Sequence, residues 1–337
     1  MEAVVIGGID IGGTKVAVSV ADHSGILCRL SQPTLKTGED DAVPMQVAAL
    51  LRAACDKAGV ARVDAVGVSS CGPFAMEDGA ICLVTPNICG GLSAAPDLPN
   101  DWRHIPLEAV LRQQFPELVV CNDAQAALVG ERTFGAVQDE PDCIYVTWST
   151  GVGFGLCVDG QVLKGKHGNA GHAGHMLMSE VSQAQCGCGN IGDLESLISG
   201  RNLARRLGRS TADVFNAARA GNASAYEVAL SAAQWLGRGL YNMVATLDLR
   251  QIVIGGSVWE HHGDWLAPIV QQEIHGRLPA LTQGVVLKRA ALGNLVADVG
   301  ALSLVLPASW KEDWRARRPW TGLLLPVEVQ AAPFSGN

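Results

Sequence analysis

The chain has 337 residues, 48% of them hydrophobic, and a formal net charge of −8. Because a single core stops growing near about 250–300 residues, this length predicts two domains. The acidic balance excludes a broad basic surface for nucleic acid or an anionic membrane, and no apolar run is long enough to span a bilayer. No secretory leader precedes the ten cysteines, so we expect reduced thiols in a cytoplasmic protein.

The first predicted element is a hairpin with strands over residues 3–9 and 15–20, where apolar and β-branched residues dominate. Its turn reads Asp10-Ile11-Gly12-Gly13-Thr14-Lys15. The glycines let the backbone approach a ligand and present N–H groups to an anion. Thr14 adds a hydroxyl donor, and Asp10 suits a magnesium-bound water. A plain tight turn is the alternative for this pair of glycines.

The next elements are predicted from the spacing of apolar residues. A helix covers residues 44–58, and a short buried strand covers residues 65–69. Residues 85–106 are rich in Pro, Gly, Asn and Asp, which indicates a long loop. A short helix over residues 107–114 then leads to a buried strand over residues 118–121.

Asn122 and Asp123 follow this strand directly and precede a helical run over residues 124–129. In α/β folds a carboxylate at a strand's carboxyl end faces the ligand crevice. Phosphoryl transfer needs one carboxylate that accepts the proton of the attacking hydroxyl. Asp123 suits that role, with Asn122 orienting the acceptor. The alternative is that Asp123 only caps the helix.

A second strand, glycine turn and strand unit covers residues 143–158, which suggests two halves built on one plan. Its turn, Ser149-Thr150-Gly151-Val152-Gly153, has the same capacity for phosphate through Thr150 and the glycine amides. Gly255-Gly256-Ser257 follows a third buried strand and suits a nucleobase or ribose. No Walker motif occurs, and no Gly-x-Gly-x-x-Gly follows the first strand.

These elements predict two lobes and an extension. Residues 1–121 form an amino-terminal α/β lobe, to which a helix at about 291–306 returns. Residues 122–290 form a larger lobe, mostly helical over residues 196–247. Residues 307–337 form a carboxyl-terminal extension without clear periodicity or assigned function.

The motifs together resemble one family, the ROK sugar kinases and repressors within the actin-like and hexokinase-like ATPase superfamily. The resemblance runs from Ile9 to about Gly300. The matching segments are residues 10–15, Asn122-Asp123 with Gly130-Glu131, residues 149–153, residues 171–175 and residues 186–195.

The resemblance implies an α/β, two-lobed actin-like ATPase (ribonuclease H-like) fold of duplicated units, with ATP and Mg²⁺ in a cleft between the lobes. It implies Asp123 as general base, and phosphates bound against the turns that match Gly12 to Lys15 and Thr150-Gly151. The residues that match the family's sugar ligands are Gly72, Asn87, Asn122, Asp123, His175 and Glu195.

One departure concerns the sugar site. Most family members read Glu-x-Gly-His where this chain has His172-Ala173-Gly174-His175, and in this it resembles bacterial N-acetylmannosamine kinases. Histidine replaces an anionic acceptor by a group that also donates, so the ligand preference is expected to shift. The alternative is that His172 has no selective role.

A second departure concerns a metal. Family members usually bind a structural Zn²⁺ through one histidine and three cysteines. Here His175, Cys186 and Cys188 match three of these positions, and the fourth is Asp193. A carboxylate oxygen can complete a tetrahedral zinc site. A metal-free loop held by hydrogen bonds from Asp193 is the alternative.

The resemblance implies ATP-dependent phosphorylation of a hydroxyl group of a hexose or related sugar. N-acetylmannosamine, another N-acylhexosamine or a C7-cyclitol are alternative substrates, and polyphosphate is an alternative donor. A catalytically silent sugar-responsive regulator would be expected to lose the base, yet Asp123 is present. A DNA-binding domain of the family's repressors finds no room before a strand that starts at about residue 3. Relatives are commonly dimers or tetramers, so a homodimer or homotetramer is expected.

Overall fold

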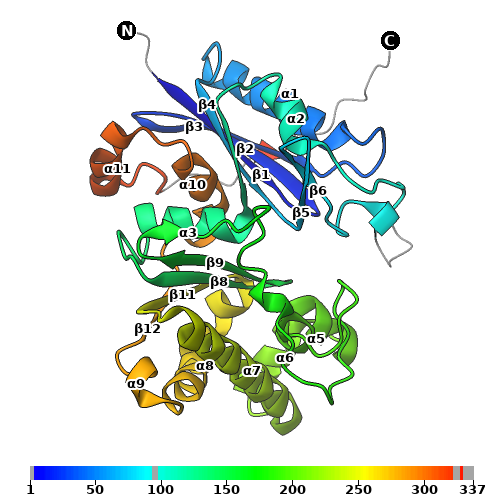
Figure 1. Cartoon of the computed structure of the whole chain (residues 1–337), viewed down its shortest axis with the longest axis vertical. Coiled ribbons are helices and arrows are strands. Elements are labelled where there is room, and N and C mark those ends of the chain that lie inside the picture. The colour runs from blue at the N-terminus through cyan, green and yellow to red at the C-terminus, as the bar shows by residue number, and fades with distance from the viewer. Residues whose placement is uncertain (1–3, 93–97, 322–326, 329–337) are drawn as a thin grey trace. The chain divides into compact units, whose positions relative to one another are not determined.

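The computed structural model describes residues 4–92, 98–321 and 327–328 (Figure 1). Its contacts divide the chain into two compact units. The first comprises residues 1–134, 164–169 and 294–337, and the second comprises residues 135–163 and 170–293.

This division differs from the predicted lobe boundary at residue 121. Helix α3 (Asp123–Thr133) belongs to the first unit because it packs against α10 (Val296–Ser303). A Cβ on Gly300 of α10 would lie only 2.7 Å from the carbonyl oxygen of Ala126, so glycine permits this close approach.

The first unit is built on a six-stranded sheet with the order β13-β3-β2-β1-β4-β7. Strands β1, β2 and β3 are antiparallel neighbours, whereas β4 and β7 run parallel to β1. The bounds are Val5–Ile11 for β1, Lys15–Asp22 for β2, Gly25–Pro33 for β3, Ala65–Ser70 for β4, Leu118–Asn122 for β7 and Val327–Glu328 for β13. The predicted hairpin and the two predicted buried strands are confirmed. Residues 1–3, with the start of the predicted first strand, lie outside the described residues.

Helices cover both faces of this sheet. Helix α1 (Ala42–Ala58) packs on β2 and β3, and α10 packs on β1 and β4 from the other side (Figure 1). Helix α1 ends where predicted, at Gly59, whose φ of 70° closes the last turn. The helix predicted at 291–306 does return to the first unit, with its α-helical part shorter than predicted.

The segment between β4 and β7 contains a small hairpin that the sequence analysis missed. Strands β5 (Phe74–Glu77) and β6 (Ala80–Leu83) pair antiparallel. Their turn is Asp78-Gly79 with φ of 48° and 80°, and Asp-Gly between two short runs is a recognised hairpin signal. The short 3₁₀ helix η1 (Gly90–Leu92) and helix α2 (Leu107–Arg112) follow. Of the predicted long loop over 85–106, residues 93–97 lie outside the described residues.

The carboxyl-terminal extension has regular structure where the sequence shows no periodicity. A 3₁₀ turn η4 (Ala308–Trp310) leads into α11 (Lys311–Arg317), and β13 pairs parallel with β3. The rings of Trp314 and Trp320 lie 5.9 Å and 4.7 Å from that of Phe134, at the end of α3. Aromatic burial therefore fastens the extension to the first unit. Residues 322–326 and 329–337 of the tail lie outside the described residues.

The second unit repeats the plan of the first. Its sheet has the order β10-β9-β8-β11-β12, with antiparallel pairing from β10 to β8 and parallel pairing from β8 to β12. The strands are β8 (Cys143–Trp148), β9 (Val152–Val158), β10 (Gln161–Val162), β11 (Gln251–Gly255) and β12 (Val286–Arg289). Three antiparallel strands followed by two parallel ones occur in both sheets, which confirms the predicted duplication.

The helices of the second unit account for the predicted helical stretch. They are α4 (Leu194–Ile198), α5 (Gly200–Leu207), α6 (Thr211–Arg219), α7 (Ala223–Leu247), α8 (Ser257–His275) and α9 (Pro279–Thr282). Helices α7 and α8 pack against each other, and α8 also contacts β8, β11 and β12. The buried apolar residues of these elements form one core.

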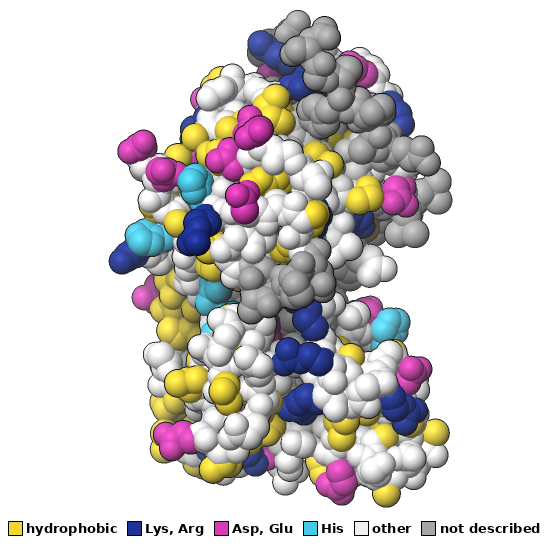
Figure 2. All heavy atoms as spheres, turned by 90° about the vertical axis from the view of Figure 1, so that its right-hand side faces the viewer, with side chains coloured by type: hydrophobic (Ala, Val, Ile, Leu, Met, Phe, Trp, Pro, Cys, Tyr) yellow, Lys and Arg dark blue, Asp and Glu magenta, His cyan; other side chains and the backbone are white. Residues whose placement is uncertain are grey.

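The surface agrees with the acidic composition. On the face drawn in Figure 2, acidic and basic side chains occur in small separate groups, without a continuous basic surface over the described residues. Among the residues that the structure describes, every helix is too short or too polar to cross a membrane. No disulfide joins any of the ten cysteines, all of which are described.

Candidate functional site

The predicted base and the predicted magnesium ligand meet at one edge of the first sheet. The register of the parallel strands aligns Asp10 of β1 with Ser69 of β4, and Ser70 of β4 with Asn122 of β7. The carboxyl ends of the three strands therefore lie side by side. The Ser69 hydroxyl donates a hydrogen bond of 3.0 Å to the Asp10 carboxylate. Ser69 was not among the predicted site residues, although the predicted strand over residues 65–69 ends on it.

Asn122 and Asp123 divide the tasks at the start of α3. Asn122 is the N-cap, is 7% exposed, and accepts a hydrogen bond from the Ala124 N–H at 3.1 Å. Asp123 is the first helical residue, and its carboxylate accepts from the same N–H at 2.8 Å. Both side chains therefore contact the N–H that needs a cap, and the alternative that Asp123 caps the helix stays open beside its expected role as general base.

The electrostatic setting of both carboxylates favours the neutral form. Burial raises the pKa of Asp123 to about 6, although hydrogen bonds, including that from Ala124, oppose the rise. Protein atoms surround the Asp123 carboxyl group and lower its hydration, although the side chain keeps a solvent-exposed surface. Burial raises the pKa of Asp10 to about 7, with the nearby charges of Asp123 and Asp298 adding to it and the Ser69 hydroxyl opposing it. A bound divalent cation would favour ionised Asp10.

The glycine turn of the first hairpin is held by residues that follow β3. The Gly12 N–H donates to the Lys15 carbonyl at 2.9 Å, which closes the turn. Thr34 donates its hydroxyl to the Gly12 carbonyl at 2.7 Å and its N–H to the Thr14 carbonyl at 3.0 Å. Thr14 and Lys15 remain exposed. The turn is therefore fixed from one side and open for a ligand on the other.

Two of the predicted sugar ligands lie in loops of the first unit. Asn87 is exposed and follows β6, and a Cβ on Gly13 would lie 3.0 Å from the Cβ of Asn87. The absence of a side chain at Gly13 lets this loop approach the turn. Gly72 is half-buried and precedes a cis bond to Pro73.

The glycine turn of the second unit has a different support. The N–H groups of Gly200 and Arg201, at the start of α5, donate to the carbonyls of Ser149 and Thr150 at 2.8 Å and 3.1 Å. The Glu195 carboxylate accepts from the Val152 N–H at 2.9 Å. A predicted sugar ligand, Glu195, thus contacts the predicted phosphate turn directly.

His172 and His175 come together on one short turn. The 3₁₀ helix η2 (Ala173–His175) begins after His172. The two imidazole rings stack with centroids 6.1 Å apart and an interplanar angle of 25°. Any group that replaces His172 therefore changes the surroundings of His175.

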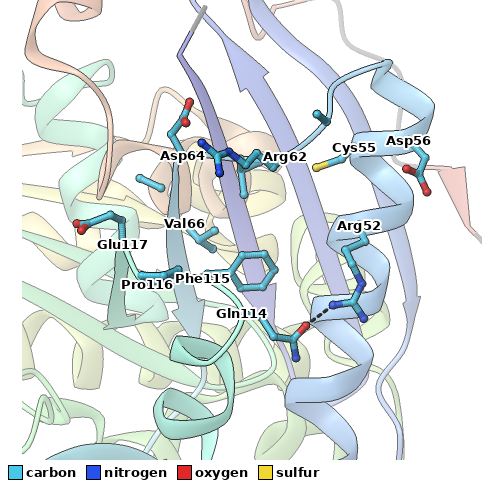
Figure 3. A pocket seen from close by; sticks show the side chains of 13 residues that line it. Arg52, Cys55, Asp56, Arg62, Asp64, Val66, Gln114, Phe115, Pro116 and Glu117 are labelled. Carbon is cyan, nitrogen blue, oxygen red and sulfur yellow. Dashed lines mark hydrogen bonds between the residues drawn. The ribbon is translucent and has the colours of Figure 1, made fainter. Parts of the chain in front are cut away.

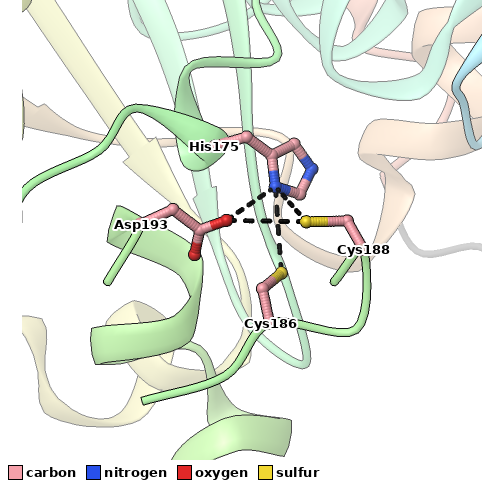
Figure 4. Close-up of side chains that lie close together, drawn as sticks. All are labelled: His175, Cys186, Cys188 and Asp193. Carbon is pink, nitrogen blue, oxygen red and sulfur yellow. Dashed lines mark hydrogen bonds and ion pairs between the residues drawn. The ribbon is translucent and has the colours of Figure 1, made fainter. Parts of the chain in front are cut away.

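The predicted metal ligands form a compact group within the second unit (Figure 4). The His175 Nδ1 lies 3.2 Å from the Asp193 carboxylate, 3.8 Å from the Cys186 Sγ and 3.4 Å from the Cys188 Sγ. Zinc bonds of about 2.0–2.3 Å in a tetrahedron place ligand atoms roughly 3.3–3.8 Å apart. The three separations from His175 lie close to this range, and the ligand atoms of all four side chains lie within 4.8 Å of one another, which is consistent with a structural zinc site.

Asp193 uses its two carboxylate oxygens for different contacts. Its Oδ1 accepts a hydrogen bond of 2.7 Å from the Ser196 N–H and so caps α4. Its Oδ2 faces His175 and Cys188. Burial alone would raise the pKa of Asp193, but the hydrogen bonds from His175 and Ser196 outweigh it and lower that pKa. Without a metal the ionised form of Asp193 is therefore favoured, and zinc would displace the proton that lies between His175 Nδ1 and this carboxylate.

The third glycine junction has a packing explanation. Gly256 has a φ of 88°, and a Cβ there would lie 2.5 Å from the Trp148 carbonyl oxygen. Only glycine fits between β11 and β8 at this point. Ser257 is exposed at the start of α8. The expected contact of Gly255-Gly256-Ser257 with a nucleotide stays a prediction.

A cavity of about 560 Å³ opens in the first unit, away from these residues (Figure 3). It lies beside the amino ends of β4 and β7, and its lining includes Arg52, Cys55, Arg62, Val66 and Phe115. The predicted site residues of this unit lie at the opposite, carboxyl ends of the strands. None of the predicted site residues lines the cavity.

Comparison with known proteins agrees with this geometry. A model of the ROK family matches residues 6–308. An N-acetylmannosamine kinase of Citrobacter koseri is 35% identical over 258 residues, which cover 74% of this chain and 82% of that protein.

Solved structures match over most of their length. A ROK hexokinase from Thermus thermophilus has a TM-score of 0.73 and 31% identity, covering 89% of this chain and 97% of that one. A ROK family glucokinase from Streptomyces griseus, in complex with glucose and AMPPNP, has a TM-score of 0.65 and 29% identity, covering 89% and 98%. The chain belongs to the ROK family and has its two-sheet α/β, actin-like ATPase fold.

Proposed function

We propose that the chain transfers the terminal phosphoryl group of ATP to a hydroxyl group of a hexose or a related sugar. The main support for this proposal is the position and the raised pKa of Asp123. Its carboxylate is exposed directly after β7, and its pKa is raised to about 6. A general base works best when its pKa lies near the operating pH. The bound glucose and AMPPNP of the Streptomyces griseus relative support a sugar acceptor and a nucleotide donor.

In the proposed reaction, Asp123 accepts the proton of the sugar hydroxyl as its oxygen attacks the phosphorus. The substrate ligands assigned to the chain are Gly72, Asn87, Asn122, His172, His175 and Glu195. The amides of the turns at residues 12–15 and 150–151 would receive the phosphates, and Asp10 would hold a water of a bound Mg²⁺ ion. When bound, that cation neutralises charge that develops on the triphosphate. The cleft between the lobes stays a prediction.

An N-acylhexosamine is the second candidate acceptor. It is favoured by His172, whose ring stacks on that of His175, and by the 35% identity to an N-acetylmannosamine kinase. An imidazole N–H can donate to an amide carbonyl, which a carboxylate cannot do. The C7-cyclitol and the polyphosphate donor stay open.

We also propose that zinc is bound by His175, Cys186, Cys188 and Asp193. Zinc would supply a structural cross-link there, joining η2, the loop over residues 186–190 and the start of α4. Glu195 lies in the first turn of α4, and the ligand Asp193 is the N-cap of that helix. The cross-link would thereby hold a proposed sugar ligand in place.

A phosphorylation screen tests the proposal. ADP release is measured with ATP and Mg²⁺ across glucose, mannose, N-acetylglucosamine, N-acetylmannosamine and a C7-cyclitol. We expect sugar-dependent ADP release with at least one hexose or N-acylhexosamine. ADP release that no sugar stimulates would contradict the proposed function.

The expected homodimer or homotetramer and the expected cytoplasmic location stay predictions. Light scattering after gel filtration measures the oligomeric state.

A further inference from the structure

Lys36 makes contacts that no role above explains. It lies just after β3 and is half-buried. Its Nζ donates to the carbonyl of Gly13 at 2.5 Å and to the carbonyl of Asn87 at 2.9 Å. The first carbonyl belongs to the proposed phosphate turn, and the second belongs to a proposed sugar ligand.

The backbone of Lys36 is tied to the same loop. The Asn100 amide donates to the carbonyls of Lys36 and Ile88 at 3.0 Å and 3.1 Å. Its oxygen accepts from the N–H of Gly90 at 2.8 Å. Both ends of Lys36 thus join the segment that carries Asn87, so a shift of that segment moves the ammonium group as well.

The bond to Gly13 also sets the direction of a neighbouring donor. Within one trans peptide unit, the carbonyl and the following N–H point in opposite directions. Because the Gly13 carbonyl faces Lys36, the Thr14 N–H faces away from it. A compact ammonium with three donors can serve two carbonyls at once. Burial lowers the pKa of Lys36, in keeping with its position between protein groups.

We propose that Lys36 is a positioning residue that couples the phosphate turn to the Asn87 loop, so that nucleotide binding strengthens sugar binding and the reverse. This inference rests on the proposed function. Such coupling is reciprocal, because each ligand must change the affinity of the other by the same factor. Without the ammonium, the turn and the loop would keep only the close approach of Gly13 to Asn87, so their coupling would weaken.

The test compares wild-type protein, Lys36→Met and the control Lys57→Met, which removes an exposed lysine at the end of α1. Calorimetry measures the affinity for the sugar identified in the screen, with and without AMPPNP and Mg²⁺. We expect AMPPNP to tighten sugar binding at least about fivefold in wild type and Lys57→Met. In Lys36→Met we expect this factor to fall below about twofold, with the KM values for both substrates raised.

Two results would overturn the inference while leaving the proposed function intact. One is an active wild-type protein without coupling, and the other is an unchanged coupling factor in Lys36→Met. A rise in the KM for ATP alone would identify Lys36 as a simple phosphate contact. Circular dichroism verifies folding, and Lys36→Gln replaces Lys36→Met if the latter unfolds. A wild-type protein that phosphorylates no sugar contradicts the proposed function instead.

Discussion

The two sheets share one strand plan but differ in what surrounds their glycine turns. The turn of the first hairpin is held by side chains from the loop after β3, namely Thr34 and Lys36. The turn of the second unit is held by backbone N–H groups at the start of α5 and by Glu195. The two units therefore share their strand arrangement but differ in the residues that hold each glycine turn in place.

The two units also differ in charge. The first sheet ends in two carboxylates of raised pKa, Asp10 and Asp123. In the second unit, the Glu195 carboxylate accepts a hydrogen bond from the backbone of the glycine turn. The four candidate metal ligands lie in the same unit. The proposed general base therefore belongs to the first unit, whereas proposed ligand-binding residues occur in both units.

Removing the base should have the largest effect on activity. We expect Asp123→Asn to lower kcat by about 10²–10⁴-fold, because the amide cannot accept the proton, while sugar affinity measured by calorimetry stays within a few-fold. Asn122 keeps the cap of α3, so the thermal midpoint should hardly change. Near-normal turnover would refute the assignment of chemistry to the first unit.

The next prediction concerns stability. Arg29 and Asp298 form a buried ion pair in the first unit, with N···O of 2.6 Å and 8% exposure of each side chain. Asp298→Ala should cost about 3–5 kcal/mol in the free energy of unfolding, because it leaves a buried guanidinium without its carboxylate. The control is Asp264→Ala in the second unit, whose pair with Arg219 is 46% and 59% exposed and should contribute only about 0–1 kcal/mol. Chemical denaturation measures both, and equal losses would contradict this reasoning.

Zinc should stabilise the second unit. Cys186→Ser is expected to release the metal and lower the thermal midpoint, because one of four ligands is lost. The control, Cys143→Ser, changes a buried cysteine outside the group. Elemental analysis of purified protein measures the metal directly, and wild-type protein without zinc would refute the site.

The smallest expected effect is a change in substrate preference. His172→Glu restores the residue of most family members and should change the ratio of kcat/KM for glucose and N-acetylmannosamine by about tenfold, in favour of glucose. The KM for ATP should stay the same. An unchanged ratio would show that His172 has no selective role.

Much of this fold follows from local patterns. The glycine turns, their flanking strands and the helix that starts at Asp123 were all predictable, because runs of apolar residues broken by glycine have few structural solutions. The candidate zinc site was predicted only through the family resemblance. His175 is distant in sequence from Cys186, Cys188 and Asp193, and only the fold brings the four side chains together.

The missed features depend on contacts between distant residues. Strand β3 has polar and half-exposed residues, so its pattern is weak until β2 pairs with it. Lys36 and Ser69 look like ordinary surface and strand residues until Gly13, Asn87 and Asp10 lie beside them. Periodicity cannot report such pairings.

The most direct test of the central claim is the pH dependence of kcat/KM for the sugar at saturating Mg²⁺, which favours ionised Asp10. The pKa of Asp123 is raised to about 6, so the base becomes protonated as the pH falls through that value. We expect kcat/KM to be level near pH 8 and to fall about tenfold per unit below about pH 6, because only the ionised carboxylate accepts the proton. A value that stays level from pH 8 to pH 5 would contradict Asp123 as the general base.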